Sequence, residues 1–387
     1  MNFTMSPTDE VSEEVINPFA GYLQSSEFKA LVWVQRSSGA LSMIGSVSII
    51  YSLLRYRKML WFQESGKRTT TGTYILLLIS ICDFLSSSVG SFMGTWMTPV
   101  GIAWQSSGNT ASCTTQGFFF HAFAQVASFY NVMQALYYVL TVCHKIKEES
   151  FQKPLLKFTF LWLPFVSMIG FNIWPLVDGA FSYSQRAVCS YEPYPLGCKK
   201  TGTCTRGDSA NMIRLVNTIF IMVCAFVIIL AVSKLYWFVL KTERALDKYN
   251  VQGLESVTRT QSKKVALQGI YYAGCFLATY LLWIVFSIRK FLGLPMLYWL
   301  LVCIHIFVPL QGFLNAFVYY RVNVDEVPLR NSVASTMNLV RASILGSNGG
   351  FGSQELDSNY NSQSRGNNSA TASQDLDRRD LESNSES

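Results

Sequence analysis

The sequence predicts an all-α membrane protein, in which a bundle of seven transmembrane helices is followed by an amphipathic helix and a disordered tail. Three observations lead to this fold class. Of the 387 residues, 50% are hydrophobic and 14% are charged, which is too apolar for a soluble protein of this length. Seven apolar segments are long enough to cross a bilayer. Lys and Arg gather in alternate connecting loops.

The third apolar segment, from Gly117 to Cys143, is uncharged, and the other spans are placed around it. A helix of this length spans roughly 40 Å and crosses the hydrocarbon with some tilt. The fifth segment should run past the membrane on its cytosolic side. The expected spans are Leu31–Leu54, Tyr74–Trp96, Gly117–Cys143, Leu155–Leu176, Met212–Leu240, Val265–Ile288 and Leu294–Tyr320.

The charges of the short loops predict the orientation. The loops after the first, third and fifth spans are basic, whereas the segment before the first span is acidic and the loop after the second is uncharged. Basic loops stay in the cytosol, so we expect a multi-pass plasma-membrane protein with its N-terminus outside and its C-terminus inside. Arg289 and Lys290, between the sixth and seventh spans, are an exception. No cleavable signal peptide is visible, so the first span should act as the signal anchor.

Four regions follow from these spans. Residues 1–30 form a short extracellular N-terminus, and residues 31–321 form the seven-helix domain. In residues 322–345, apolar side chains at helical spacing predict an amphipathic helix on the inner leaflet, in contact with membrane lipids. Residues 346–387 are rich in Ser, Asn, Gly and Asp and should form a disordered cytosolic tail.

Polar residues in the third span share one face. At 100° per residue, His121, Gln125 and Ser128 fall within a narrow sector, which should face other helices because polar groups avoid lipid. In the seventh span, Tyr298 and His305 share one face, and the depth of His305 is similar to that of His121. If the two helices line one cavity, His121, Gln125, Tyr298 and His305 form a ligand pocket that opens outward.

A second polar group is expected deeper in the bundle. Asp83 is the carboxylate that lies well inside a span, where an ionisable residue indicates function. Its depth matches that of Gln311 and Asn315, beside a helix that Pro309 allows to kink. We expect the three residues to form a polar network that rearranges when the seventh helix moves. Ordinary packing of a hydrogen-bonded carboxyl is the alternative.

Four of the nine cysteines lie on the predicted outer side, where disulfides form. Three pairings are possible. We favour Cys113 with Cys189 and Cys198 with Cys204; Cys198 as the partner of Cys113 is the alternative.

These features resemble those of a G-protein-coupled receptor, more closely the cyclic-AMP-receptor-like group and more distantly the secretin type. The resemblance rests on Ser80-Ile81-Cys82-Asp83, on Cys113, and on Leu310–Asn315 followed by Tyr319 and Tyr320. The chain departs from the rhodopsin-like group because Val142-Cys143-His144 replaces the acidic-Arg-aromatic triplet and the sixth span has no proline. It departs from the secretin type because residues 1–30 are too short for a large ectodomain.

The resemblance implies that the chain is a receptor and not an enzyme. Such a receptor passes an extracellular ligand signal to a heterotrimeric G protein. Receptor kinases and arrestin-like proteins would then act on the tail. The basic residues expected to face the G protein are Arg55, Arg57, Lys58, Lys145, Lys147, Lys263 and Lys264.

Other functions fit the sequence less well. A retinal protein needs a lysine in its last span, and Leu294–Tyr320 contains none. The three histidines cannot converge on a metal, because His144 lies at the opposite membrane face from the other two, so neither a metal nor another cofactor is expected. A seven-span transporter or a membrane signalling protein that uses no G protein remains the alternative, although no inverted repeat is visible. The net charge of +7 arises from the cytosolic loops and does not indicate nucleic acid.

Overall fold

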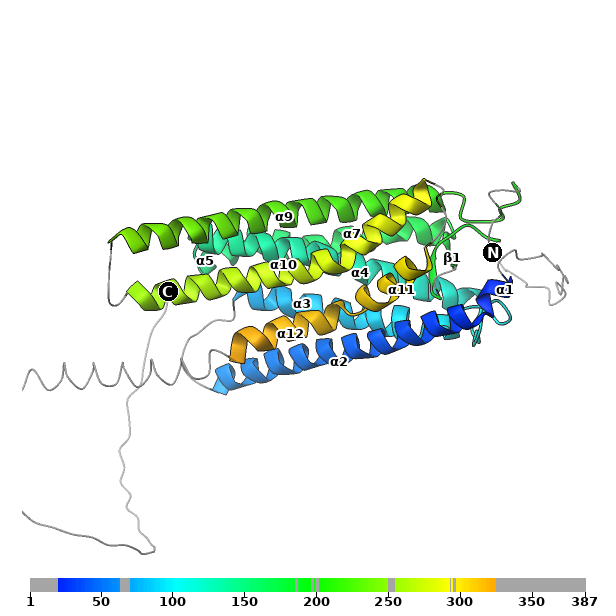
Figure 1. Ribbon diagram of the computed structural model, residues 1–387, viewed down its shortest axis with the longest axis horizontal. Helices are drawn as coiled ribbons and strands as arrows, with labels where there is room; N and C mark the ends of the chain where they lie inside the picture. The colour runs from blue at the N-terminus through cyan, green and yellow to red at the C-terminus, as the bar shows by residue number, and fades with distance from the viewer. Residues whose placement is uncertain are drawn as a thin grey trace, which may run out of the picture. The chain divides into compact units, whose positions relative to one another are not determined.

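The computed structural model describes residues 20–62, 70–184, 187–195, 198, 202–249, 255–292, 294 and 297–324. A bundle of helices carries a two-stranded hairpin at one end (Figure 1). In chain order the elements are α1 (Ala20–Leu23), α2 (Ser26–Phe62), α3 (Thr71–Ser86), η1 (Ser87–Phe92), η2 (Gly94–Met97), α4 (Thr110–Tyr138), η3 (Val139–Cys143), α5 (Glu148–Phe151), α6 (Pro154–Lys157), η4 (Phe158–Trp162), α7 (Leu163–Val177), β1 (Phe181–Tyr183), β2 (Cys189–Tyr191), α9 (Ala210–Tyr249), α10 (Glu255–Phe291), α11 (Tyr298–Phe307) and α12 (Gln311–Val324).

Six helical stretches of the described residues are long and apolar enough to cross a membrane. Helices α11 and α12, which are bent by 49° relative to each other, make the predicted seventh when the pair is counted as one span. The bend contains Pro309, as the sequence predicts, because a proline has no N–H to continue the helix. Helix α9 continues to Tyr249, which confirms that the fifth span is longer than the bilayer requires.

The second span ends earlier than predicted. Its α-helix stops at Ser86, passes through the π-helical turn η1 and reaches Gly94, whose φ of 49° is left-handed. A residue without Cβ adopts this conformation at little cost, so the α-helix does not continue to Trp96, and the chain turns into the short 3-10 helix η2.

Helix α4 lies at the centre of the bundle and packs against α3, α7, α9 and α10. Asn109 caps its start by accepting the Ser112 N–H at 2.8 Å, while the Ser112 hydroxyl accepts the Asn109 N–H at 2.8 Å. The predicted polar arc of His121, Gln125 and Ser128 is buried inside the protein, as expected of polar groups in a span.

One end of the bundle, hereafter the disulfide end, is closed by loops. The Cys113–Cys189 disulfide ties β2 to α4 and confirms the favoured pairing, and a second disulfide joins Cys198 to Cys204. Strands β1 and β2 pair antiparallel, with Phe181 opposite Tyr191. The hairpin can approach α4 closely because Gly117 leaves space: a Cβ there would lie 2.7 Å from the Phe181 ring.

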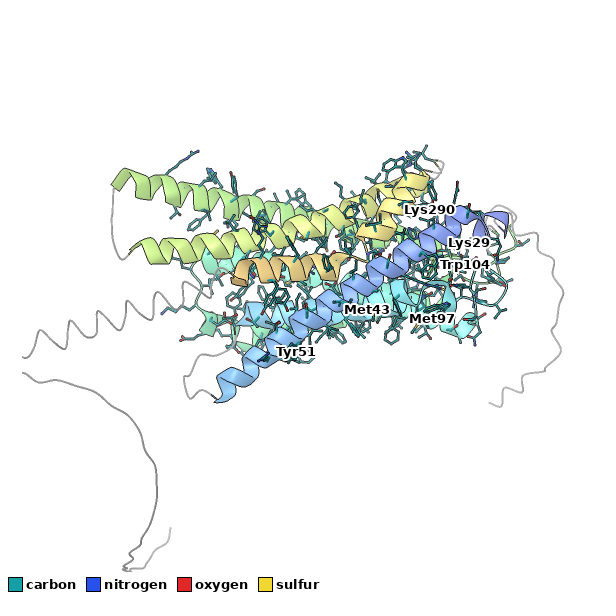
Figure 2. The ribbon with its side chains drawn as sticks, turned by 60° about the horizontal axis from the view of Figure 1, so that its bottom comes forward. Lys29, Met43, Tyr51, Met97, Trp104 and Lys290 are labelled. Carbon is teal, nitrogen blue, oxygen red and sulfur yellow. A yellow bond between two sulfur atoms is a disulfide. The ribbon has the colours of Figure 1, made fainter. Side chains whose placement is uncertain are left out.

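Other segments complete the disulfide end. The Trp104 N–H donates to the Leu23 carbonyl at 3.2 Å, so α1 is fastened to the loop after η2. Lys29 lies 6.0 Å from the centre of the Trp104 ring. Figure 2 shows Lys29, Trp104 and Lys290 at this end and Tyr51 further along α2.

The opposite end of the bundle, where Arg55, Lys145 and Lys147 are exposed, is hereafter the basic end. It contains a set of hydrogen bonds that the sequence did not indicate. The Glu148 carboxylate accepts from the backbone N–H and the hydroxyl of Thr71, both at 2.5 Å, and from the Tyr137 hydroxyl at 3.0 Å. An acidic group at the start of α3 is favourable because the N-terminus of a helix carries partial positive charge. The short helix α5 therefore holds α3 and α4 together.

Three of the expected regions lie wholly or partly outside the described residues. Of the expected amphipathic helix 322–345, residues 322–324 belong to α12 and the remainder lies outside the described residues, as do residues 1–19 and the tail 346–387.

Candidate functional site

A small cavity of about 30 Å³ lies among α4, α9, α10 and the bend between α11 and α12. None of the nine residues around it has a carboxylate, an ammonium or a guanidinium group. They are Phe120, His121, Ala124, Gln125, Asn217, Ile221, Tyr280, Trp283 and Val308. In the described part of the chain, no group of three His, Cys, Asp or Glu residues could hold a metal ion.

The hairpin contacts His121, one of the residues that line the cavity. The His121 Nε2 atom lies 2.9 Å from the Ser190 hydroxyl, and the His121 ring stacks on Tyr191 with ring centres 4.0 Å apart. Phe181 stacks at 6.2 Å from the same histidine. The loop between α7 and α9, hereafter the roof, therefore packs on a residue that lines the cavity without lining the cavity itself.

Gln125 holds four elements together beneath this roof. Its Nε2 amide donates to the Tyr191 hydroxyl at 3.0 Å and to Asn217 Oδ1 at 2.7 Å. Its Oε1 accepts from Asn172 Nδ2 at 2.6 Å, and the Tyr191 hydroxyl donates to Asn172 Oδ1 at 2.8 Å. Burial raises the pKa of Tyr191, so this hydroxyl stays protonated and remains a donor. The network fixes the position of Tyr191 relative to α4, α7 and α9.

The structure places two of the four predicted pocket residues at the cavity. His121 and Gln125 line it, whereas Tyr298 and His305 do not. Tyr298 begins α11, is 39% exposed and donates its hydroxyl to the Glu27 carbonyl at 3.3 Å. His305 is buried, with Nδ1 2.6 Å from the Leu301 carbonyl.

Sequence reasoning missed Asn172 and Asn217. Each is a buried amide in an otherwise apolar span, and that is a signal that could have identified them, since polar residues inside a membrane face the bundle interior.

The bend in the seventh span is stabilised by serines from α2. Because Pro309 has no N–H, the carbonyl of His305 loses its helical partner. The Ser38 hydroxyl donates to that carbonyl at 2.8 Å. On the other side of the bend, the Gly312 N–H donates to the Ser42 hydroxyl at 3.0 Å. The two serines are one helical turn apart, so a single face of α2 satisfies both sides of the break.

The predicted deep network is divided between two helices. Asn315 Nδ2 donates to Asp83 Oδ2 at 2.9 Å, so these two residues meet as expected. Gln311 instead accepts from the Thr279 hydroxyl of α10, at 2.7 Å. Gln311 Nε2 and Asn315 Oδ1 are buried and have no hydrogen-bond partner among the described residues. Helix α12 is therefore linked to α3 by Asn315 and to α10 by Gln311.

The predicted G-protein-facing residues lie towards the basic end. Arg55, Lys145 and Lys147 are exposed there. Arg57 and Lys58 belong to α2, and Lys263 and Lys264 belong to α10, but their side chains lie outside the described residues. Lys234 of α9 lies close to this group, with its Nζ atom 2.9 Å from His144 Nε2.

Comparison with known proteins identifies the fold. Neither the protein-family comparison nor the curated proteins contain a match to this sequence. Among solved structures, the crystal structure of squid rhodopsin is similar over 82% of this chain and 87% of that one, with a TM-score of 0.53 and 15% sequence identity. At this identity the likeness concerns the fold alone. The chain has the seven-helix fold seen in squid rhodopsin, and its long helices are apolar enough to span a membrane.

Proposed function

We propose that the chain is a receptor that binds a small extracellular ligand in the cavity and transmits this binding to a heterotrimeric G protein. In this proposal the disulfide end faces outward and the basic end faces the cytosol, as the positive-inside rule requires. The observation that carries the proposal is the position of Val308. This residue lines the cavity and directly precedes Pro309, so a bound ligand touches the bend of the seventh span.

The same ligand would also touch α10. Trp283 lines the cavity and lies one helical turn beyond Thr279, the residue that binds Gln311. Contacts with Trp283 and Val308 therefore act on two helices that are bonded to each other below the cavity. A ligand that binds one arrangement of these helices better than another shifts their equilibrium, which is the physical requirement for signalling.

The basic end supplies the second site. Movement of α10 and α12 would alter the surface around Arg55, Lys145 and Lys147, where the G protein would dock. Charge reversal of Lys263 and Lys264 should lower coupling and leave surface expression unchanged. Unchanged coupling would mean that these lysines act as topology signals and lipid anchors.

The test is nucleotide exchange on heterotrimeric G proteins reconstituted with the full chain in lipid nanodiscs, with and without a library of small ligands. A Val308→Trp variant should change ligand-dependent exchange because the indole fills the cavity. Val166→Trp is the matched control, since Val166 is 56% exposed on α7. The proposal fails if no G protein responds to any ligand, or if the two variants behave alike.

A further inference from the structure

One face of α2 carries two cations near the disulfide end. Lys29 and Arg36 lie about two turns apart on the same side of the helix, with Trp33 between them (Figure 2 shows Lys29). No ion pair in the described part of the chain includes either cation. Arg36 is only 4% exposed, and a charge that is removed from water is unfavourable unless it is paired. The two cations therefore lack the anion that their positions call for.

Indole rings alternate with these cations. The Lys29 Nζ atom lies 6.0 Å from the centre of the Trp104 ring, which lies 6.2 Å from the Trp33 ring. The Arg36 guanidinium lies 5.9 Å from the Trp33 ring and 3.9 Å from the Trp96 ring, and cations are attracted to the faces of such rings. Trp33 is 58% exposed and Trp96 is 39% exposed, so these five residues reach the surface of the bundle. They are hereafter the cation–indole patch.

The patch lies at the level of the lipid headgroups. Below Trp33, the same face of α2 presents exposed apolar side chains at Ile44, Val47 and Tyr51. The rise of about 1.5 Å per residue puts Trp33 and Tyr51 roughly 27 Å apart, close to the thickness of the hydrocarbon core. Trp and Tyr typically mark the two interfaces of a span. The Arg36 side chain extends back towards Trp33, which brings its charge to the headgroups.

Arg36 is held by neutral acceptors, and one of them is at the surface. Its Nη2 donates to Thr95 Oγ1 at 3.1 Å and its Nη1 donates to Gln105 Oε1. Its Nε is buried and has no hydrogen-bond partner among the described residues. Gln105 is exposed, and its φ of 59° is unfavourable for a residue with a Cβ. An anionic oxygen that replaced the Gln105 amide would make a stronger, charge-assisted hydrogen bond.

We propose that the cation–indole patch binds the phosphate of a phospholipid in the leaflet at the disulfide end. The phosphate replaces Gln105 at the Arg36 guanidinium, and the acyl chains lie along the exposed apolar face of α2. Lys29 attracts the phosphate and repels a headgroup ammonium, so the preferred lipid has a phosphate and no headgroup cation, as in phosphatidylglycerol. Because this surface is separate from the cavity, the proposal does not depend on the receptor function.

The test measures which lipid stays with the protein. The full-length protein is equilibrated in detergent with equal amounts of phosphatidylglycerol and phosphatidylcholine, separated by gel filtration, and its retained lipid is quantified by mass spectrometry. The parent should retain more phosphatidylglycerol. Arg36→Gln should lower the ratio about fivefold, the factor expected for one basic residue beside an anionic lipid. Arg206→Gln is the matched control, because Arg206 lies 4.8 Å from the Tyr194 ring, outside the patch, and the ratio should not change.

A second variant has the opposite expected sign. Gln105→Gly removes the acceptor that competes with the phosphate, and glycine adopts a φ of 59° at little cost. This variant should therefore retain more phosphatidylglycerol than the parent, which a general loss of structure would not produce. Thermal unfolding without added lipid verifies that the variants are folded.

Four results would overturn the proposal: equal retention of the two lipids by the parent, an unchanged ratio in Arg36→Gln, an equal fall in Arg206→Gln, or no gain in Gln105→Gly. Inorganic phosphate at millimolar concentration during equilibration identifies the source of the anion. Retention of phosphatidylglycerol in its presence supports a lipid, whereas displacement would show that the patch binds a soluble phosphate and not a lipid headgroup.

Discussion

Replacing Gly45 by Ala should separate α2 from α12 and destabilise the protein. A Cβ at Gly45 would lie 2.6 Å from Phe313 Cα and 2.8 Å from the Gly312 carbonyl oxygen. Carbon atoms in contact need about 3.5 to 4.0 Å, so one helix must move by about 1 Å. Overpacking of this kind typically costs about 1–3 kcal/mol. The displacement also threatens the 2.9 Å hydrogen bond from Asn315 to Asp83, because Asn315 is one turn beyond Gly312.

The assay is thermal unfolding of the purified full-length protein, together with its basal nucleotide exchange. Gly274→Ala is a matched control, because a Cβ at Gly274 of α10 meets nothing within 4 Å. We expect Gly45→Ala to unfold several degrees below the parent and to show altered basal exchange, with Gly274→Ala close to the parent in both. Equal unfolding temperatures for the two variants would show that the close α2–α12 contact does not constrain the bundle.

Three further predictions concern the bend, the roof and the deep network. Ser38→Ala should lower the free energy of unfolding by about 0.6–1.7 kcal/mol, because the carbonyl freed by the proline loses its donor. Ser37→Ala is the control: the described partners of its hydroxyl lie in its own helix, so thermal unfolding should not change. Equal effects of the two variants would contradict the role of Ser38. Glu192→Gln should loosen the roof by weakening both ion pairs, which hydrogen exchange would detect as faster exchange at Tyr191; an unchanged rate would mean that the hairpin is held by its other contacts. Asp83→Asn should shift basal activity or agonist efficacy more than surface expression. If the variant signals like the parent at every ligand concentration, the network contributes to packing and not to signalling.

The number of spans and the position of the bend follow from local properties, and the sequence predicts them well. Long apolar segments must form helices in a bilayer because every backbone polar group needs a partner there. Pro309 must interrupt its helix because it lacks an N–H. The burial of His121 and Gln125 follows from the cost of exposing polar groups to lipid. Each of these predictions depends on one segment and its solvent, and not on its neighbours.

The partners of the polar groups depend on how the helices pack, and here the sequence is less informative. The rise per residue gives depth, which correctly brought Asp83 near Asn315. It does not give the rotation of α12 after a bend of 49°, and Gln311 faces Thr279 instead. For the same reason, Tyr298 and His305 share a helical face, yet the cavity is lined by neither.

The charge of the cavity is the property that the sequence alone could not provide. Several cations occur near the disulfide end, and any of them could in principle have lined a ligand site. In the structure, Arg36 is 3.9 Å from the centre of the Trp96 ring and donates to Thr95 at 3.1 Å. Arg214 and Lys290 share the carboxylate of Glu192. Because each of these cations has a protein partner and none lines the cavity, the lining is left to amides and aromatic rings, and the electrostatic selectivity of the site arises from how the surrounding charges are paired.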